Sequence, residues 1–275
     1  MSLAIPSSEQ ISTSPANRAA RTGIIRLAAP ICGVSLLFAI WAFAGFLLIH
    51  NPATATFAGF APLPTLTSLR MMLLDGSVWR AVVPSAFRVG AGLAFAIAIG
   101  APVGVLVGQS RFFREATYIP FQLLRMVSPL AWMPIAILMF ASWDGAIVFL
   151  IAAAAIWPII FAVANGLKKL DPDWIKVAHN LGANSWHVLN AVIIPATAQD
   201  FLTGIRLAVG VAWIVLVPAE YLGVTSGLGY AINDARDTLE YNRLGAFVLV
   251  IGVIGFLFDG LLLALIQRVS WTRRG

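Results

Sequence analysis

Four ionisable side chains stand within or at the ends of long apolar runs, where a charge needs a physical reason. They are Arg88, Arg125, Glu220 and Asp259. A charged side chain at the centre of a bilayer costs at least about 2.5–3.5 kcal/mol on insertion scales, so each requires a partner, a water-filled cavity or a function. For Arg88 and Glu220, a structural ion pair or a side chain that reaches the membrane interface explains the charge as well as a function does. For Asp259, a structural ion pair is favoured over a role with a solute.

Arg125 is the strongest candidate for binding chemistry. Its guanidinium offers a planar fork of donors that suits a nitrate, carboxylate or sulfonate group. Ser128 lies three residues further on the same helical face and can add a hydroxyl. We therefore predict that Arg125 faces a pathway for an anion. The alternative is a structural ion pair between Arg125 and Glu220.

No group of residues supports catalysis by this chain. His50, His179 and His187 lack metal-ligand spacing, and no Ser/His/Asp arrangement can be argued. The sequence contains no G-x-x-x-x-G-K-[ST] phosphate loop, so the chain cannot hydrolyse ATP alone. The single cysteine, Cys32, has no disulfide partner. We predict a protein that is not an enzyme, with no catalytic residues, no metal and no bound cofactor.

The composition is that of an integral membrane protein. Of the 275 residues, 60% are hydrophobic and 11% charged, against about 25% charged in soluble domains. The apolar residues form blocks near the roughly 20 residues that cross a bilayer as a helix, and open strand edges cannot lie in lipid. We predict an all-α fold with six transmembrane helices, at Ile24–Ile49, Phe87–Val107, Tyr118–Phe140, Ala146–Leu167, Phe201–Leu222 and Leu244–Ile266.

The remaining segments complete the predicted organisation. Residues 1–23 are rich in Ser, Ala and Pro and are predicted to be a disordered cytoplasmic tail. A permease-like transmembrane domain covers 24–268, with an internal loop at 168–200, and 269–275 forms a cytoplasmic tail. The amphipathic stretch from Leu69 to Val83 is predicted to lie along the outer interface.

Basic residues indicate the orientation. Eleven Lys or Arg fall at the predicted inner ends of the helices and four at the outer ends, so both termini are predicted to be cytoplasmic. The formal net charge of +6 would suggest nucleic acid in a soluble protein. Here the inner loops account for it, and no nucleic-acid partner is predicted.

The internal loop carries an unusual pattern for a simple connection. Asp171 and Pro172 predict a helix start, and Gly182 predicts its end. Trp174, Val177 and Leu181 then share one apolar stripe. A second short helix follows, capped at Asn184 or Ser185 and ended near Pro195. Exposed apolar stripes on a loop indicate a protein partner.

This loop resembles that of ATP-binding-cassette (ABC) importer permeases. Their pattern reads Glu-Ala-Ala, three residues, Gly, nine residues, then Ile-x-Leu-Pro. It fits Lys176-Val177-Ala178, Gly182 and Val192-Ile193-Ile194-Pro195 without a shift in spacing, with Lys176 in place of Glu. The resemblance implies a coupling helix that docks on an ATPase subunit. The residues that it assigns to coupling are Asp173, Trp174, Lys176, Val177, Ala178, Gly182, Ala183, Trp186 and Pro195.

The rest of the chain from Trp79 onward resembles the nitrate, sulfonate, taurine and bicarbonate branch of these permeases. The stretch from Arg125 to Ala136 (RMVSPLAWMPIA) and Ile156-Trp157-Pro158 are closest to the nitrate type. Pro218-Ala219-Glu220-Tyr221-Leu222 and the TSGLGY stretch that follows are closer to the sulfonate and taurine type. The predicted pathway residues are Arg88, Arg125, Ser128, Trp132, Trp157, Trp213 and Glu220.

The resemblance implies a type I ABC importer permease fold in the bacterial inner membrane. It also implies two copies of the permease, ATPase subunits that bind ATP and Mg²⁺, and an external solute-binding protein. The predicted function is ATP-driven import of a small anion by alternating access. An ion-gradient-driven secondary transporter or channel is the alternative. A membrane enzyme or assembly factor is disfavoured because no catalytic cluster is present.

Overall fold

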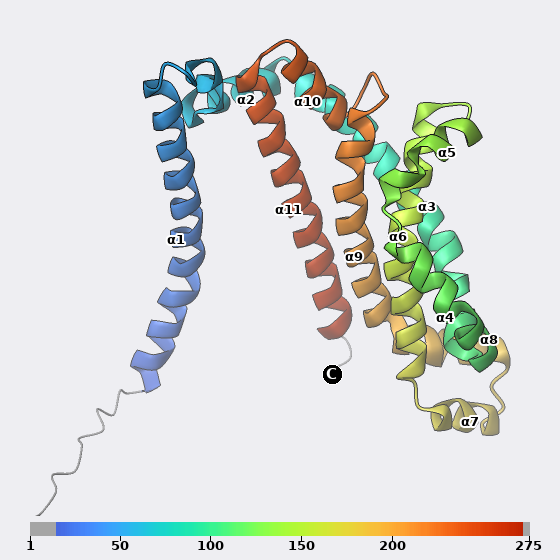
Figure 1. Ribbon diagram of the computed structural model, residues 1–275. Helices are drawn as coiled ribbons and strands as arrows, with labels where there is room; N and C mark the ends of the chain where they lie inside the picture. The colour runs from blue at the N-terminus through green and yellow to red at the C-terminus, as the bar shows by residue number, and fades with distance from the viewer. Residues whose placement is uncertain (1–14, 272–275) are drawn as a thin grey trace, which may run out of the picture. The chain divides into compact units, whose positions relative to one another are not determined.

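The computed structural model describes the backbone of residues 15–271, and every regular element in that range is a helix (Figure 1). The elements in chain order are α1 (Pro15–His50), η1 (Ala55–Phe60), α2 (Pro62–Leu74), α3 (Ser77–Gln109), α4 (Arg111–Met126), η2 (Pro129–Trp132), α5 (Met133–Met139), α6 (Trp143–Lys168), α7 (Pro172–Asn180), α8 (Ser185–Val188), η3 (Leu189–Ile193), α9 (Ile194–Tyr221), α10 (Leu228–Asp237) and α11 (Tyr241–Trp271). Residue contacts divide the chain into two compact units, Met1–Pro64 and Thr65–Gly275.

The first unit is a long apolar helix followed by a short 3₁₀ turn. The Trp41 indole Nε1 donates to the Phe60 carbonyl at 2.8 Å, which fixes η1 against α1. Gly45 permits the same approach, because a Cβ there would lie 3.0 Å from Ala61. The predicted tail over 1–23 differs from the structure in part, since α1 already begins at Pro15. Ala and Arg in that stretch favour helix, and residues 1–14 lie outside the described range.

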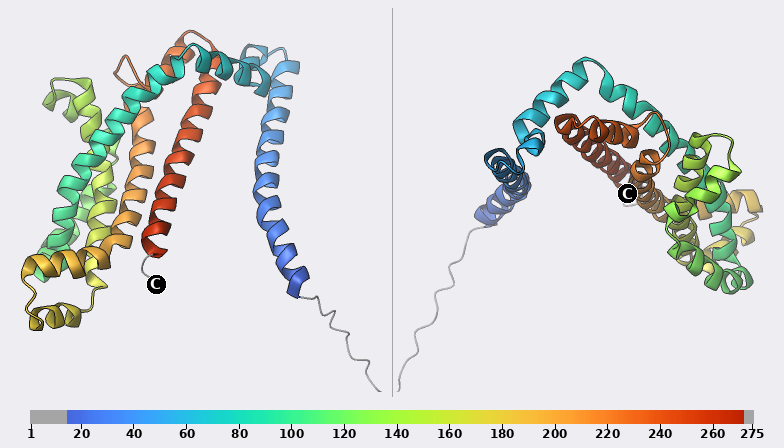
Figure 2. Two further views of the ribbon diagram at one scale, coloured as in Figure 1. Left: turned by 180° about the vertical axis from the view of Figure 1, so that it is seen from behind. Right: turned by 45° about the horizontal axis from the view of Figure 1, so that its top comes forward.

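The second unit is built around α6, which packs between α3 and α9 (Figures 1 and 2). Small residues on α3 permit this packing: a Cβ at Gly92 would lie 2.5 Å from the Ile151 side chain, and one at Gly104 2.8 Å from the Ile160 carbonyl. The apolar core is continuous across the three helices. Gly92, Ala96, Gly100 and Gly104 recur every four residues on α3 and are buried, the spacing at which small residues let membrane helices approach closely.

Five helices are long and apolar enough to cross a membrane within the described range, and a bent helix pair makes a sixth candidate. They are Ala28–His50, Ser77–Gln109, Trp143–Lys168, Ser185–Tyr221 and Tyr241–Arg268. The pair Arg111–Met126 and Pro129–Met139 bends by 89°. These lengths agree with the predicted six spans, although several boundaries differ. The second span begins ten residues earlier than Phe87, at Ser77.

The third span was predicted as one helix over Tyr118–Phe140, and this is wrong. The backbone is extended at Val127 and Ser128, so the span consists of α4, η2 and α5. Pro129 explains the break, because proline pushes the residue before it out of the helical region. The break exposes backbone and side chains beside α6, where the candidate site lies.

The internal loop also differs from its prediction at one end. The second short helix does not stop at Pro195. It runs through a π-helical turn, Leu189–Ile193, directly into α9. The wider turn accommodates Pro195, whose missing N–H interrupts the regular helical bonding where η3 runs into α9.

The amphipathic stretch predicted over Leu69–Val83 is divided between two helices. Gly76 has φ +76° between α2 and α3, a conformation that favours glycine. The Asp75 carboxylate accepts from the Ser77 N–H at 2.8 Å. This hydrogen bond lowers the pKa of Asp75 from its usual value. The stretch therefore forms a corner that starts α3.

The approach of α6 to α9 predicts the effect of adding one methyl group. A Cβ at Gly204 would lie 2.3 Å from the Ala162 Cβ, whereas Gly210 on the same helix has no atom within 4 Å of that position. Gly204→Ala should lower the stability of the detergent-solubilised protein by about 1–3 kcal/mol, as overpacking does. Gly210→Ala is the matched control and should preserve or raise it. Thermal denaturation followed by size-exclusion chromatography measures both, and equal melting temperatures for the two variants would contradict this packing.

Candidate functional site

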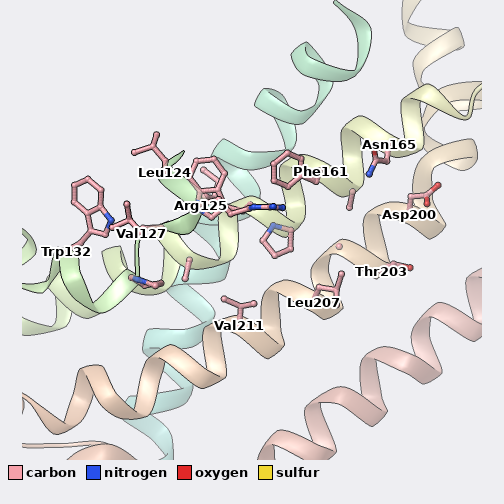
Figure 3. A pocket seen from close by; sticks show the side chains of 18 of the residues that line it. Leu124, Arg125, Val127, Trp132, Phe161, Asn165, Asp200, Thr203, Leu207 and Val211 are labelled. Carbon is pink, nitrogen blue, oxygen red and sulfur yellow. The ribbon is translucent and has the colours of Figure 1, made fainter. Parts of the chain in front are cut away.

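A cavity of about 1080 Å³ lies beside the break between α4 and η2 and is bounded by α6 and α9 (Figure 3). Its lining comes from these elements in a row, with Trp132 and Asp200 toward opposite ends and Arg125 between them (Figure 3). Most lining side chains are apolar. A concave, mainly apolar pocket with a few polar groups is the usual form of a small-molecule site.

The charged side chains in this cavity are mostly basic. Arg125, Lys168 and Lys169 line it together with one acid, Asp200. Arg125 lies in the last turn of α4, and its guanidinium carbon is 5.2 Å from the centre of the Phe161 ring. A cation over a ring face is held by the ring quadrupole and keeps its donors free at the edge. The cavity therefore offers excess positive charge to a solute, together with Arg125 N–H groups that make no hydrogen bond within the described residues.

The alternative prediction for Arg125, an ion pair with Glu220, is wrong. Glu220 is fully buried and pairs with Arg88 instead, at 2.5 Å between Nη1 and Oε1. Within the described part of the chain, Arg125 makes no ion pair. The positive charge of Arg125 is therefore available to a solute in the cavity, as the pathway prediction requires.

Arg88 and Glu220 form a closed polar network near the start of α6. Arg88 Nε donates to Asp144 Oδ1 at 2.8 Å, and its two Nη atoms donate to the carbonyl and hydroxyl of Ser226 at 2.8 and 2.9 Å. The Ser85 hydroxyl lies 2.8 Å from both Glu220 carboxylate oxygens. Every face of the guanidinium therefore has an acceptor, which is the condition for burying it.

The segment between α9 and α10 completes this network. The Leu228 N–H donates to Ser85 Oγ at 2.8 Å, and the Gly229 N–H donates to Glu220 Oε2 at 2.9 Å. Gly227 has φ +109°, and a Cβ there would lie 2.4 Å from Glu220 Oε1. Arg88 and Glu220 therefore tie α3, α6, α9 and α10 together and lie outside the cavity lining. The structural explanation of these two charges fits the geometry better than a pathway role.

The other predicted pathway residues divide in the same way. Trp132 and Trp157 line the cavity. Ser128 and Trp213 are not among its lining residues in the described part of the chain. Trp213 packs edge-to-face against Phe258, with ring centres 5.5 Å apart. Ser128 is exposed at the break before η2, because the span bends there and does not continue as a helix.

Several residues that line the cavity were not predicted from the sequence. Asn165, Lys168, Lys169, Asp200 and Thr203 lie at the end of the cavity nearest the internal loop. Lys168, Lys169 and Asp200 flank that loop, so only their position at its two ends suggested that they meet. Asp259, the fourth charge in an apolar run, forms a two-pronged ion pair with Arg206 at 2.6 and 2.7 Å, which fits its structural explanation.

The internal loop folds largely as the sequence predicted. The Asp171 carboxylate accepts from the Asp173 N–H at 2.9 Å and starts α7. Gly182, at φ +83°, ends it: the Ala183 N–H donates to the Ala178 carbonyl at 3.0 Å and the Gly182 N–H to the His179 carbonyl at 2.9 Å. This pair of bonds is the Schellman motif, in which glycine takes the left-handed position.

The outer face of this loop is apolar and exposed. Trp174 is 58% exposed, Leu181 82% and Trp186 67%. Lys176 pairs with Asp173 of the same helix at 2.7 Å. Pro195 is also exposed, on the first turn of α9. Side chains of this size left uncovered on a loop with fixed helix ends indicate a surface for a protein partner.

Comparison with known proteins places the chain in a family. The family described as binding-protein-dependent transport system inner membrane component matches residues 96–271. The chain belongs to this family. It is therefore an ABC importer permease subunit, and its relatives are permease subunits and not enzymes.

Two relatives show the range of the family. The bicarbonate transport system permease protein CmpB of Synechococcus elongatus is 34% identical over 203 residues, which cover 73% of this chain and 70% of that protein. The taurine transport system permease protein TauC of Escherichia coli is 32% identical over 197 residues, covering 72% of each. The structure is similar to the inward-facing MetNI methionine ABC transporter, with a TM-score of 0.59 and 17% identity over 69% of this chain and 94% of that chain. The predicted type I importer permease fold is confirmed.

The buried network predicts which charge the fold depends on. Glu220→Gln should remove the one fully buried partner charge of Arg88 and should lower stability by about 3–5 kcal/mol. Asp144→Asn removes the other partner, whose side chain is 63% exposed, and should cost much less because water can replace it. Yield and melting temperature of the solubilised protein measure both. A loss from Asp144→Asn as large as that from Glu220→Gln would contradict this account of the network.

Proposed function

We propose that this permease moves a small oxyanion through the cavity beside Arg125. The observation that carries the proposal is the excess of basic side chains in an otherwise apolar cavity within a membrane-spanning fold. A charge within a membrane-spanning segment is costly unless it serves the solute or pairs with another charge. Arg125 has its donors directed to the cavity and shares its charge with no acid in the described residues. A guanidinium suits planar and tetrahedral oxyanions alike.

The proposed solutes are bicarbonate, nitrate and taurine or another alkanesulfonate. CmpB and TauC are named for bicarbonate and taurine transport. The segment around Arg125 resembles nitrate-type permeases, and the segment around Glu220 resembles the sulfonate and taurine type. All of these solutes present an oxyanion of similar size. An external solute-binding protein would select among them and deliver one to the membrane.

Transport is proposed to be driven by ATP hydrolysed on a separate subunit. ATP and Mg²⁺ would bind to that ATPase and not to this chain, which has no phosphate loop. The exposed apolar face of α7 is the proposed contact, and its rigid Schellman end would transmit the movement. Two copies of the permease would enclose the pathway, with α7 and both termini on the cytoplasmic side, as the distribution of basic residues predicts.

The alternative, a secondary transporter or channel driven by an ion gradient, gives the exposed stripe on α7 no role. Such a protein needs no docking surface for an ATPase. It also commonly carries two repeated halves with matching broken helices, whereas the one broken span in the described part of the chain is α4 with η2 and α5. The ABC importer proposal accounts for both features.

The proposal predicts a specific effect of Arg125→Lys. The charge survives but the planar fork is lost, so solute uptake at limiting concentration should fall by about tenfold or more, the effect of losing one charge-assisted hydrogen bond. Arg111→Lys is the matched control, because Arg111 is 87% exposed and pairs with Glu115 on the surface. Uptake of labelled bicarbonate, nitrate and taurine into proteoliposomes with ATPase and binding protein measures the effect. Unchanged uptake of all three in Arg125→Lys would refute the proposed pathway.

A further inference from the structure

The side of α6 that lines the cavity beside Arg125 changes in character along the helix. Trp157, Phe161, Asn165 and Lys168 all line this cavity, and their spacing of three and four residues places them in one stripe. The stripe is aromatic in the middle of α6, where Arg125 lies over the Phe161 ring. It becomes polar and then basic in the last turn, next to the internal loop.

The polar groups of Asn165 and Lys168 are free to bind a solute. Neither side chain makes a hydrogen bond or an ion pair within the described residues. The Asn165 amide has two N–H donors and the Lys168 ammonium has three. Thr203 on α9 lines the same end of the cavity (Figure 3), but its hydroxyl already donates to the Gln199 carbonyl at 2.8 Å. The free donors at this end therefore lie on α6, one helical turn apart.

The two charges beside Lys168 cancel each other. Lys169 Nζ lies 2.5 Å from Asp200 Oδ1, so this pair has no net charge. A second cavity, of about 750 Å³, lies beneath the internal loop and shares Lys169, Asp200 and Thr203 with the first. Asn165 and Lys168 line the first cavity only. Among the described residues, Lys168 is therefore the uncompensated cation at this end of the first cavity.

A lysine at the end of a membrane-spanning helix also has an ordinary explanation. Its charge interacts favourably with the carboxyl end of the helix dipole and with anionic lipid headgroups. Neither interaction requires a position on the wall of a cavity. Lys168 nevertheless shares the stripe of Phe161 and lines the cavity with it, which favours a role toward a solute.

We propose that Asn165 and Lys168 form a second oxyanion position, to which the solute passes after Arg125 and from which it leaves the permease. The direction of passage and the choice of solute rest on the proposed function. Lys168 lies seven residues beyond Phe161, or about 10 Å along the helix axis, so the two positions are distinct. An exposed ammonium holds an anion weakly because water competes for both charges, and weak binding suits release. The cavity is a half-open groove, whose open side the second copy of the permease would cover.

Protection of a single thiol measures binding at this position without transport. In a Cys32→Ser background, Thr203→Cys places the thiol at the same end of the cavity. The solubilised full-length permease reacts with methyl methanethiosulfonate, a neutral reagent, while nitrate, bicarbonate or taurine is added at constant ionic strength. A bound anion should slow the reaction. Lys168→Gln should raise the half-protecting concentration by about tenfold or more, and Asn165→Leu by about three- to tenfold, since each removes a hydrogen bond to a charged group.

Two matched controls separate this position from its surroundings. Arg125→Lys should leave the half-protecting concentration at Thr203→Cys within about twofold of the parent, because Arg125 belongs to the other position about 10 Å away. Lys169→Gln combined with Asp200→Asn removes a neutral pair and should have an equally small effect. A loss of protection in Arg125→Lys as large as that in Lys168→Gln would show one position in place of two.

The charge of Lys168 can be measured at the same thiol. An anionic and a cationic methanethiosulfonate are compared, and the ratio of their rates reports the local potential. Lys168→Gln should lower the anionic-to-cationic ratio by about three- to tenfold, since the loss of one charge acts in opposite directions on the two reagents. Lys168→Arg should keep the ratio of the parent, and about 1 M salt should reduce the difference. A lysine that faces only lipid headgroups would leave the ratio unchanged in Lys168→Gln.

The outcomes distinguish the second position from the proposed function. No protection by any of the three solutes, or protection that Lys168→Gln leaves unchanged, would overturn the second position. If protection depends on Lys168 but the parent shows no ATP-dependent uptake with its ATPase and binding protein, the second position stands and the proposed function fails. If uptake depends on Arg125 while protection does not depend on Lys168, the proposed function stands and the second position is wrong.

Discussion

The approach of α6 to its two neighbours determines what the rest of the second unit can do. In a membrane no hydrophobic force draws helices together, so association depends on close packing and on hydrogen bonds between helices. Glycines supply the packing here: Gly92 and Gly104 on α3 and Gly204 on α9 leave no room for a Cβ beside α6. A rigid three-helix core results. The broken span, the internal loop and both cavities are attached to this core.

The charged side chains at the two ends of the three-helix core differ in burial and in the number of their polar contacts. Arg88 and Glu220 are buried, and a full set of acceptors and donors compensates their desolvation. Lys169 and Asp200, at the other end, are partly exposed and have one contact with each other. Arg125, which lines the cavity between them, makes no ion pair within the described chain. The first arrangement fixes helices, the second cancels two exposed charges, and the third suits a passing anion.

The sequence predicted the elements well where a local rule determines them. Apolar length determined the spans, and Asp171 and Gly182 determined the start and end of α7 through capping. The break at Pro129 was missed because proline is tolerated inside transmembrane helices when neighbours satisfy the backbone. The third span contains Pro120, Pro129 and Pro134, and nothing local in the sequence shows that Pro129 is the one at the break.

The candidate site was predicted only in part, because pairing between distant residues has no local signal. Arg125, Trp132 and Trp157 were identified as pathway residues and do line the cavity. The partner of Glu220 could not be chosen between Arg88 and Arg125, since both lie in apolar runs with the same cost. Lys169 and Asp200, which are 31 residues apart, meet only because α6 and α9 pack together.

The central claim is that this permease receives its drive from a separate ATPase through α7. The most direct measurement is site-specific photo-crosslinking from Val177, which is 56% exposed on the apolar face of α7, in cells that express the whole transport system. A second probe at Asp234 on α10, at the opposite end of the bundle (Figure 1), is the control. The account predicts an adduct with a nucleotide-binding protein from Val177 and none from Asp234. No such adduct from Val177, in protein that is inserted and assembled, would contradict it.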